Sequence, residues 1–121
     1  MRLSFYIVGS ALSEKEPRDV DIYGVMDDVL FKTQYLPPAE FMKEWRKGRK
    51  AEETWPAGMK RWIYEGLGAV RVMQMIFPEL VPIDFKFIPR SLLQEPNLEV
   101  DITKPPSTWG IGFPNLMKHG V

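Results

Sequence analysis

The sequence predicts one α/β (α+β) domain, with a small mixed, twisted β-sheet flanked by two or three helices. Three features predict this class: two strand-like segments near the N-terminus, a long segment with helical periodicity in the middle, and an alternating strand-like segment after it. The chain has 121 residues, of which 45% are hydrophobic. This length suits one hydrophobic core and is too short for two ordinary domains, so residues 1–121 are expected to form a single domain.

The first two strands are expected within the first 25 residues. Leu3 to Val8 is an apolar run typical of a buried strand, and Gly9-Ser10 ends it. The polar segment 11–18 is expected to form a loop. A second strand then covers residues 20–25, with alternating apolar and polar side chains.

Two helices are expected in the middle of the chain. The first starts at Pro38 or Ala39 and runs to about Lys47. The second starts near Trp55-Pro56 and ends at Pro78. Its apolar positions follow the spacing of one buried helix face: Met59, Trp62, Ile63, Leu67, Val70, Met73 and Phe77. This spacing favours a core role for the tryptophans and methionines over a ligand-binding role.

A third strand is expected over residues 80–88, where apolar and polar side chains alternate. Asp84 then lies on the face opposite Ile83 and Phe85. An acid inside a strand is costly to bury unless it is paired or faces water. Residues 98–102 are a further candidate edge strand.

Asp19 and Asp21 form the most informative pair of residues. Side chains two apart in a strand point to the same face, roughly 6.5–7 Å apart along it. Two neighbouring carboxylates repel each other, and both stay ionised when a cation lies between them. Oxygen ligands of this kind suit Mg²⁺ or Mn²⁺. If the third strand lies beside the second, Asp84 joins this pair.

These segments resemble the signature of the DNA polymerase β-like nucleotidyltransferase superfamily. The signature is an apolar residue followed by Gly-Ser, a spacer, an Asp-apolar-Asp-apolar stretch and a third acid on a later strand. The chain carries Val8-Gly9-Ser10, then Asp19-Val20-Asp21-Ile22, and then Asp84. The resemblance covers mainly residues 3–25 and 81–88.

The resemblance implies a reaction and a set of site residues. The reaction is metal-dependent transfer of a nucleoside monophosphate from an NTP to an acceptor hydroxyl. The catalytic and metal-binding residues would be Asp19, Asp21 and Asp84, with Mg²⁺ or Mn²⁺ as cofactor. The nucleotide-binding residues would be Gly9, Ser10, Lys15 and Arg18. The acceptor is open among RNA, protein and small molecules, and the site could be completed by a homo-oligomer or a partner protein.

Two departures from the family pattern keep alternatives open. Only eight residues separate Ser10 from Asp19, which leaves little room for a helix. About sixty residues separate Asp21 from Asp84, so Glu79 competes with Asp84 for the third acidic role. One alternative is a degenerate, non-catalytic protein of this fold that binds a nucleotide, RNA or a protein partner. Another is a small interaction module, which would expose an apolar patch on residues 41–63.

Composition excludes several other classes of function. The 16 basic and 16 acidic residues cancel, so no global field attracts nucleic acid. The basic residues of segment 43–50 are interpreted as a solvated helix end rather than a phosphate site. The chain has no cysteine and one histidine, which excludes disulfides and thiolate chemistry and disfavours Ser-His-Asp catalysis. Neither a signal peptide nor a membrane-spanning run is visible, so a cytoplasmic protein is expected.

Overall fold

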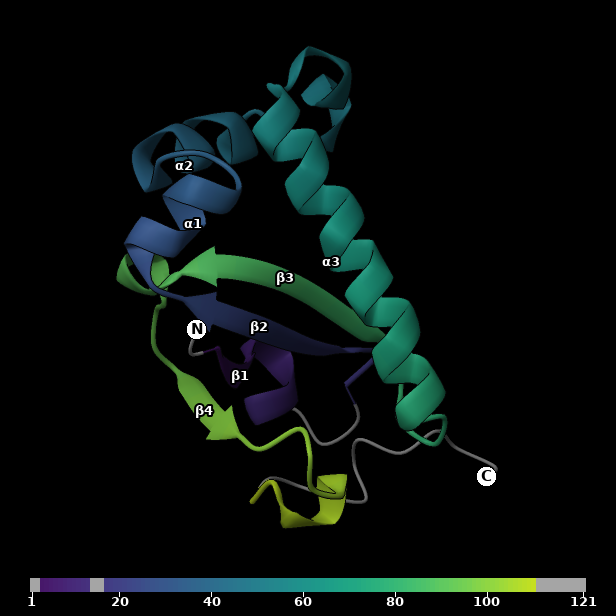
Figure 1. The fold of residues 1–121 in the computed structure, drawn as a ribbon. Helices are drawn as coiled ribbons and strands as arrows, with labels where there is room; N and C mark the ends of the chain where they lie inside the picture. Colours follow the sequence, from purple (N-terminus) through teal and green to yellow (C-terminus); the bar gives the residue numbers. More distant parts are fainter. Residues whose placement is uncertain (1–2, 14–16, 111–121) are drawn as a thin grey trace.

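A four-stranded mixed sheet forms the centre of the computed structural model, which describes residues 3–13 and 17–110 (Figure 1). The strands are β1 (Ser4–Val8), β2 (Val20–Met26), β3 (Ile83–Pro89) and β4 (Asn97–Val100), in the order β3-β2-β1-β4. The β2 and β3 strands are parallel, and β1 is antiparallel to both of its neighbours. The predicted mixed sheet, and with it the α+β class, is confirmed.

Three α-helices accompany the sheet in the described part of the chain. They are α1 (Asp28–Gln34), α2 (Pro38–Arg46) and α3 (Ala57–Ile76), and all three lie between β2 and β3 in the sequence. The sequence pattern predicted α2 and α3 but not α1. A side-chain cap explains α1: the Asp27 carboxylate accepts a hydrogen bond of 3.2 Å from Val29 N and satisfies one of the free N–H groups of the first turn.

In the described part of the link between β1 and β2, a 3-10 turn covers Gly9–Leu12, which agrees with the short helix or absent helix expected from its length. The last strand, β4, ends at Val100, before Asp101. The Asp101 carboxylate accepts hydrogen bonds from the backbone N–H and the hydroxyl of Thr103, which turns the chain away from the sheet.

Helix α3 covers one face of the sheet, crossing it beside β3 (Figure 1). Alternate strand side chains on this face are buried against the C-terminal half of α3 and the segment after it. The members of this cluster include Ile7, Val20, Ile22, Met73, Phe77, Ile83 and Phe85. The side chains between them in sequence therefore point to the opposite face of the sheet.

A second cluster joins the three helices beside the edge strand β3. Trp62 of α3 is at its centre, with ring centroids 4.8 Å from Phe41 and 5.0 Å from Trp45. Its indole Nε1 donates a hydrogen bond of 2.7 Å to the carbonyl of Phe87 on β3. The expected core role therefore holds for Trp62 and for Trp55, which are 1% and 3% exposed.

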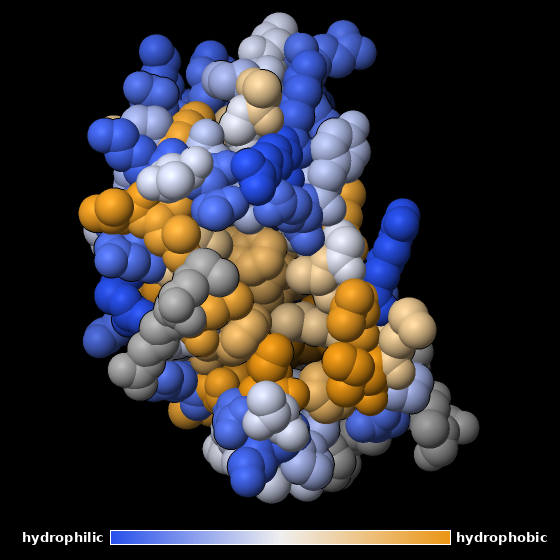
Figure 2. Space-filling model, viewed as in Figure 1, coloured by the Kyte–Doolittle hydropathy of each residue, from blue (hydrophilic) through white to orange (hydrophobic). Residues whose placement is uncertain are grey.

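Most of the exposed large apolar side chains are on α3, one is on α1, and none of those described is within residues 41–63. Among the described residues they are Val29, Tyr64, Leu67, Val72, Met75 and Ile76. Leu67 was expected in the core but is 44% exposed, because the helix turns this position away from the sheet. Figure 2 shows apolar side chains over the sheet and along the C-terminal part of α3, with hydrophilic ones covering much of the helical part above. Within the described segments, every helix is too short or too polar to span a lipid bilayer.

Candidate functional site

The structure brings Asp21 and Asp84 side by side. The parallel register of β2 and β3 pairs Asp21 with Asp84, and the antiparallel register of β1 and β2 pairs Asp21 with Val8. Both carboxylates therefore leave the sheet on the face opposite α3, close to the end of β1. Asp19 precedes β2 by one residue and is near enough to contribute to the field at Asp21.

Gly9 completes this corner of the site. Its backbone has a φ of 75°, a conformation that glycine adopts without strain and that other residues rarely adopt. A Cβ atom at this position would lie 2.9 Å from Asp21 Oδ2. The positive φ therefore favours glycine here, and a side chain at this position would also push against the end of the Asp21 carboxylate.

The local field raises the pKa of Asp21 above its ordinary value. Partial burial is the largest cause, followed by the charges of Asp19 and Asp84, and the Lys86 ammonium acts in the opposite direction. Partial burial also raises the pKa of Tyr23, which follows Asp21 on the same face. The site is thus a half-buried acidic corner that would gain from an added positive charge.

Lys86 supplies part of that charge and was not among the site residues predicted from the sequence. Its Nζ atom lies 2.8 Å from Asp84 Oδ2 and 5.7 Å from the centre of the Trp45 ring. The two-residue spacing between Asp84 and Lys86 already indicated a shared face. The approach of Trp45 depends on how α2 folds over the edge of the sheet, and no local sequence signal predicts it.

The other predicted site residues have different outcomes. Ser10 is half-buried in the 3-10 turn, and Arg18 is exposed beside Asp19. Lys15 lies outside the described residues. Glu79, the competitor of Asp84, is in the segment before β3 and lines a different cavity near residues 102–106. As the described side chains stand, they form no group of three or more acids or histidines that could hold a metal ion.

A cavity of about 440 Å³ opens beside the acidic corner. Gly9, Asp21 and Lys86 line its polar part, whereas Tyr23 and side chains of α2 and α3 supply aromatic walls. The aromatic members are Tyr23, Phe41, Trp45 and Trp62, and the loop 94–96 closes another side. This volume is within the range of roughly 300–1,000 Å³ that is usual for small-ligand sites.

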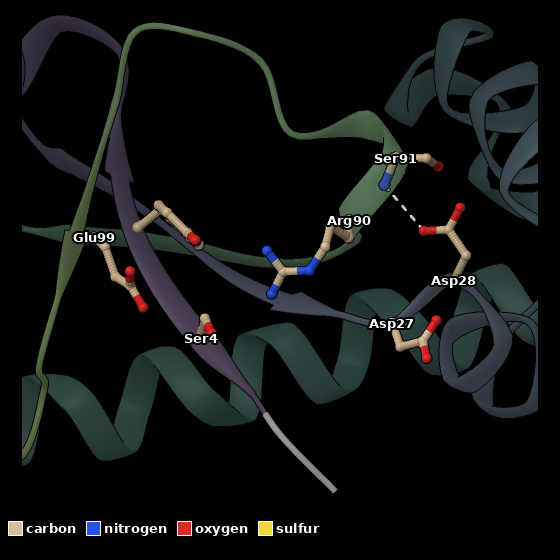
Figure 3. A pocket seen from close by; sticks show the side chains of 7 residues that line it. Ser4, Asp27, Asp28, Arg90, Ser91 and Glu99 are labelled. Carbon is tan, nitrogen blue, oxygen red and sulfur yellow. Dashed lines mark hydrogen bonds between the residues drawn. The ribbon is translucent and has the colours of Figure 1, made fainter.

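A second, wider hollow of about 910 Å³ lies on the same face of the sheet, toward the other end of β1. Figure 3 shows the Arg90 guanidinium extending between Ser4 and Asp27, with Glu99 farther along the sheet. Asp28 accepts a hydrogen bond of 3.0 Å from Ser91 N at its rim. The lining of this hollow carries charges of both signs and includes none of the predicted site residues.

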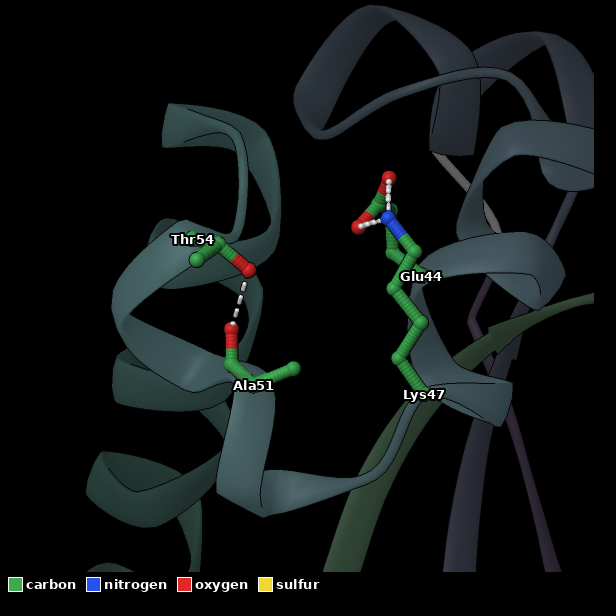
Figure 4. A network of polar contacts seen from close by, with 4 residues as sticks. All are labelled: Glu44, Lys47, Ala51 and Thr54. Atoms are coloured by element: carbon green, nitrogen blue, oxygen red, sulfur yellow. Dashed lines mark hydrogen bonds and ion pairs between the residues drawn. The ribbon is translucent and has the colours of Figure 1, made fainter.

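The basic segment 43–50 takes part in local ion pairs. Lys47 forms an ion pair of 3.1 Å with Glu44, and Arg49 forms one of 3.3 Å with Glu52 (Figure 4 shows the first). Thr54 closes the following turn by donating to the carbonyl of Ala51, which the same view shows. These local pairs involve two of the five basic residues of the segment, and the interpretation as a solvated helix end stays a prediction.

Comparison of the chain with models of known families, with curated proteins and with solved structures found no match.

Proposed function

We propose that the chain is a metal-dependent nucleotidyltransferase that moves a nucleoside monophosphate from an NTP to an acceptor hydroxyl. The observation that carries the proposal is the register pairing of Asp21 with Asp84 on parallel strands, beside Gly9 at the end of β1. Three sequence elements that resemble one catalytic signature thus lie around one acidic corner.

The donor chemistry of this corner suits a hard divalent cation. The two register-paired carboxylates offer oxygen ligands, and Asp19 lies close enough to raise the pKa of Asp21. Asp19, Asp21 and Asp84 would hold Mg²⁺ or Mn²⁺. When bound, the cation would neutralise phosphate charge and stabilise the oxygens whose bonds change.

The residues of the chain have separate roles in this proposal. Gly9 allows the backbone to approach the phosphates closely, and Ser10 offers a hydroxyl donor. Lys86 and Arg18 add positive charge for the triphosphate. The acceptor oxygen attacks the α-phosphorus, the bond from that phosphorus to the bridging oxygen breaks, and pyrophosphate leaves. Asp84 accepts the proton of the attacking hydroxyl.

Calorimetric titration of ATP, CTP, GTP and UTP, each with Mg²⁺ or Mn²⁺, tests this proposal. We expect NTP binding that requires the divalent ion and is lost in Asp21→Asn. Asp101→Asn is the matched control, because Asp101 is an exposed turn residue outside the site. Absence of NTP binding by the folded wild-type protein, or unchanged binding by Asp21→Asn, would contradict the proposal.

One observation favours the non-catalytic alternative as a second candidate. Asp84 already has a cationic partner in Lys86, at 2.8 Å, so the corner is partly neutralised without a metal. A protein of this kind would bind NTP in EDTA, through Lys86 and the cavity. Retained binding in EDTA that is weakened in Lys86→Gln would support this alternative over the catalytic proposal.

A further inference from the structure

The aromatic cavity beside the acidic corner combines two kinds of surface that a nucleotide needs. The parallel pairing of β2 with β3 places Asp21 beside Asp84. Two residues farther along the same face, roughly 6.5–7 Å away, it places Tyr23 beside Lys86. The cavity therefore extends from charged groups toward aromatic side chains in one direction along the sheet.

Trp45 is the aromatic residue best suited to contact a ligand. Trp62 is 1% exposed and uses its indole N–H on β3, whereas Trp45 is only half-buried and lines the cavity. Two neighbouring rings pack against Trp45. The plane of the Trp62 ring lies at 76° to the Trp45 plane, and the plane of the Trp55 ring lies at 45° to it. A partly open indole is a suitable stacking platform for a flat ring.

The position of Lys86 links this platform to the charged corner. Its ammonium group lies near Asp84 and over the Trp45 ring at the same time. A ligand that carries a flat ring and a polyanionic group could satisfy both partners, because its ring would contact Trp45 while its anion met Lys86. Neither a simple phosphate nor an apolar ligand would match both parts of the cavity.

We infer that this cavity binds the nucleoside part of the NTP, with the base stacked on Trp45 and the phosphates directed toward Gly9 and Lys86. The inference rests on the proposed function and adds the base-binding subsite. The base edge then faces the loop at 94–96, where the side chains of Gln94 and Glu95 offer hydrogen-bonding groups. These two residues are therefore the expected determinants of base preference.

The test compares Trp45→Leu with Trp45→Phe. Leucine keeps apolar bulk against Trp55 and Trp62 but has no ring face, whereas phenylalanine keeps a ring. Each variant is titrated with the four NTPs and with inorganic tripolyphosphate, all in Mg²⁺, after circular dichroism has shown native folding. Tyr64→Ala is the control, because Tyr64 is an exposed aromatic residue of α3 that does not line the cavity.

We expect Trp45→Leu to bind NTPs roughly 5- to 150-fold more weakly, which is the range for loss of one base-stacking contact. Its affinity for tripolyphosphate should stay within about twofold of wild type, and Trp45→Phe should retain most of the NTP affinity. Tyr64→Ala should match wild type for both ligands.

Two results would overturn the inference while leaving the proposed function intact. Equal weakening of NTP and tripolyphosphate binding in Trp45→Leu would assign Trp45 a purely structural role. Unchanged NTP binding in that variant would place the base elsewhere. By contrast, absence of NTP binding by the wild-type protein would overturn the proposed function and the inference together.

Discussion

Replacing Asp21 by Asn is expected to stabilise the metal-free protein at neutral pH. In the fold, Asp21 stands beside Asp84 on the neighbouring parallel strand, and Asp19 adds a further negative charge. Asparagine has nearly the same shape as aspartate but no charge, so the substitution removes repulsion without opening a cavity. If the Asp21 charge stabilised the fold instead, Asp21→Asn would lower the free energy of unfolding.

The expected gain is modest. Like charges that face each other on adjacent strands destabilise a sheet by roughly 0.2–1 kcal/mol. The Lys86 ammonium, 2.8 Å from Asp84, offsets part of this repulsion. Urea denaturation in EDTA, followed by tryptophan fluorescence, measures the gain. With a urea m-value of about 2 kcal/mol/M, the midpoint should rise by roughly 0.1–0.5 M.

The pH dependence follows from the raised pKa of Asp21. Between the ordinary value of 3.8 and the higher folded-state value, the folded protein binds more protons at this carboxyl than the unfolded chain does. The wild-type free energy of unfolding therefore falls as the pH rises through this window. The advantage of Asp21→Asn should be near zero below pH 3.8 and should reach its plateau above the folded-state pKa.

Asp101→Asn should instead lower the free energy of unfolding at neutral pH. Hydrogen bonds from the Thr103 hydroxyl and backbone N–H lower the pKa of Asp101, so its ionised form stabilises the turn above the ordinary pKa and this contribution is lost as the pH falls.

The prediction for Asp21 is contradicted if Asp21→Asn is equally stable or less stable than wild type at pH 7 in EDTA. Added Mg²⁺ should stabilise wild type but not Asp21→Asn.

Four further predictions concern packing, and urea denaturation measures each one. Gly58→Ala should destabilise by about 2 kcal/mol or more, because its Cβ would lie 2.1 Å from the carbonyl oxygen of Tyr35. Gly68→Ala, in the same helix, should stabilise by about 0.5–1 kcal/mol, because its Cβ would meet no atom within 4 Å; a loss would contradict this. Trp62→Phe should cost about 2 kcal/mol through the lost hydrogen bond to a carbonyl of β3. The same change at Trp55, whose buried Nε1 has no partner among the described residues, should cost less.

Local periodicity and chain breakers accounted for much of the fold. Alternation in residues 20–25 and 80–88 predicted β2 and β3 and the face on which Asp21 and Asp84 lie, because side-chain direction in a strand is a local property. The helix pattern between Pro56 and Pro78 likewise predicted α3. Helix α1 was missed because its seven residues present too short a pattern and depend on the Asp27 cap.

The sequence by itself determined the strands, the main helix and the acidic residues worth testing, since these follow from neighbouring residues along the chain. Only the tertiary structure decided which of those residues meet. Asp21 and Asp84 are more than sixty positions apart, and they pair only because their strands adopt a parallel register. The approach of Lys86 to Trp45 needs α2 to fold over the edge of the sheet. Such contacts depend on the packing of distant segments, which no local pattern specifies.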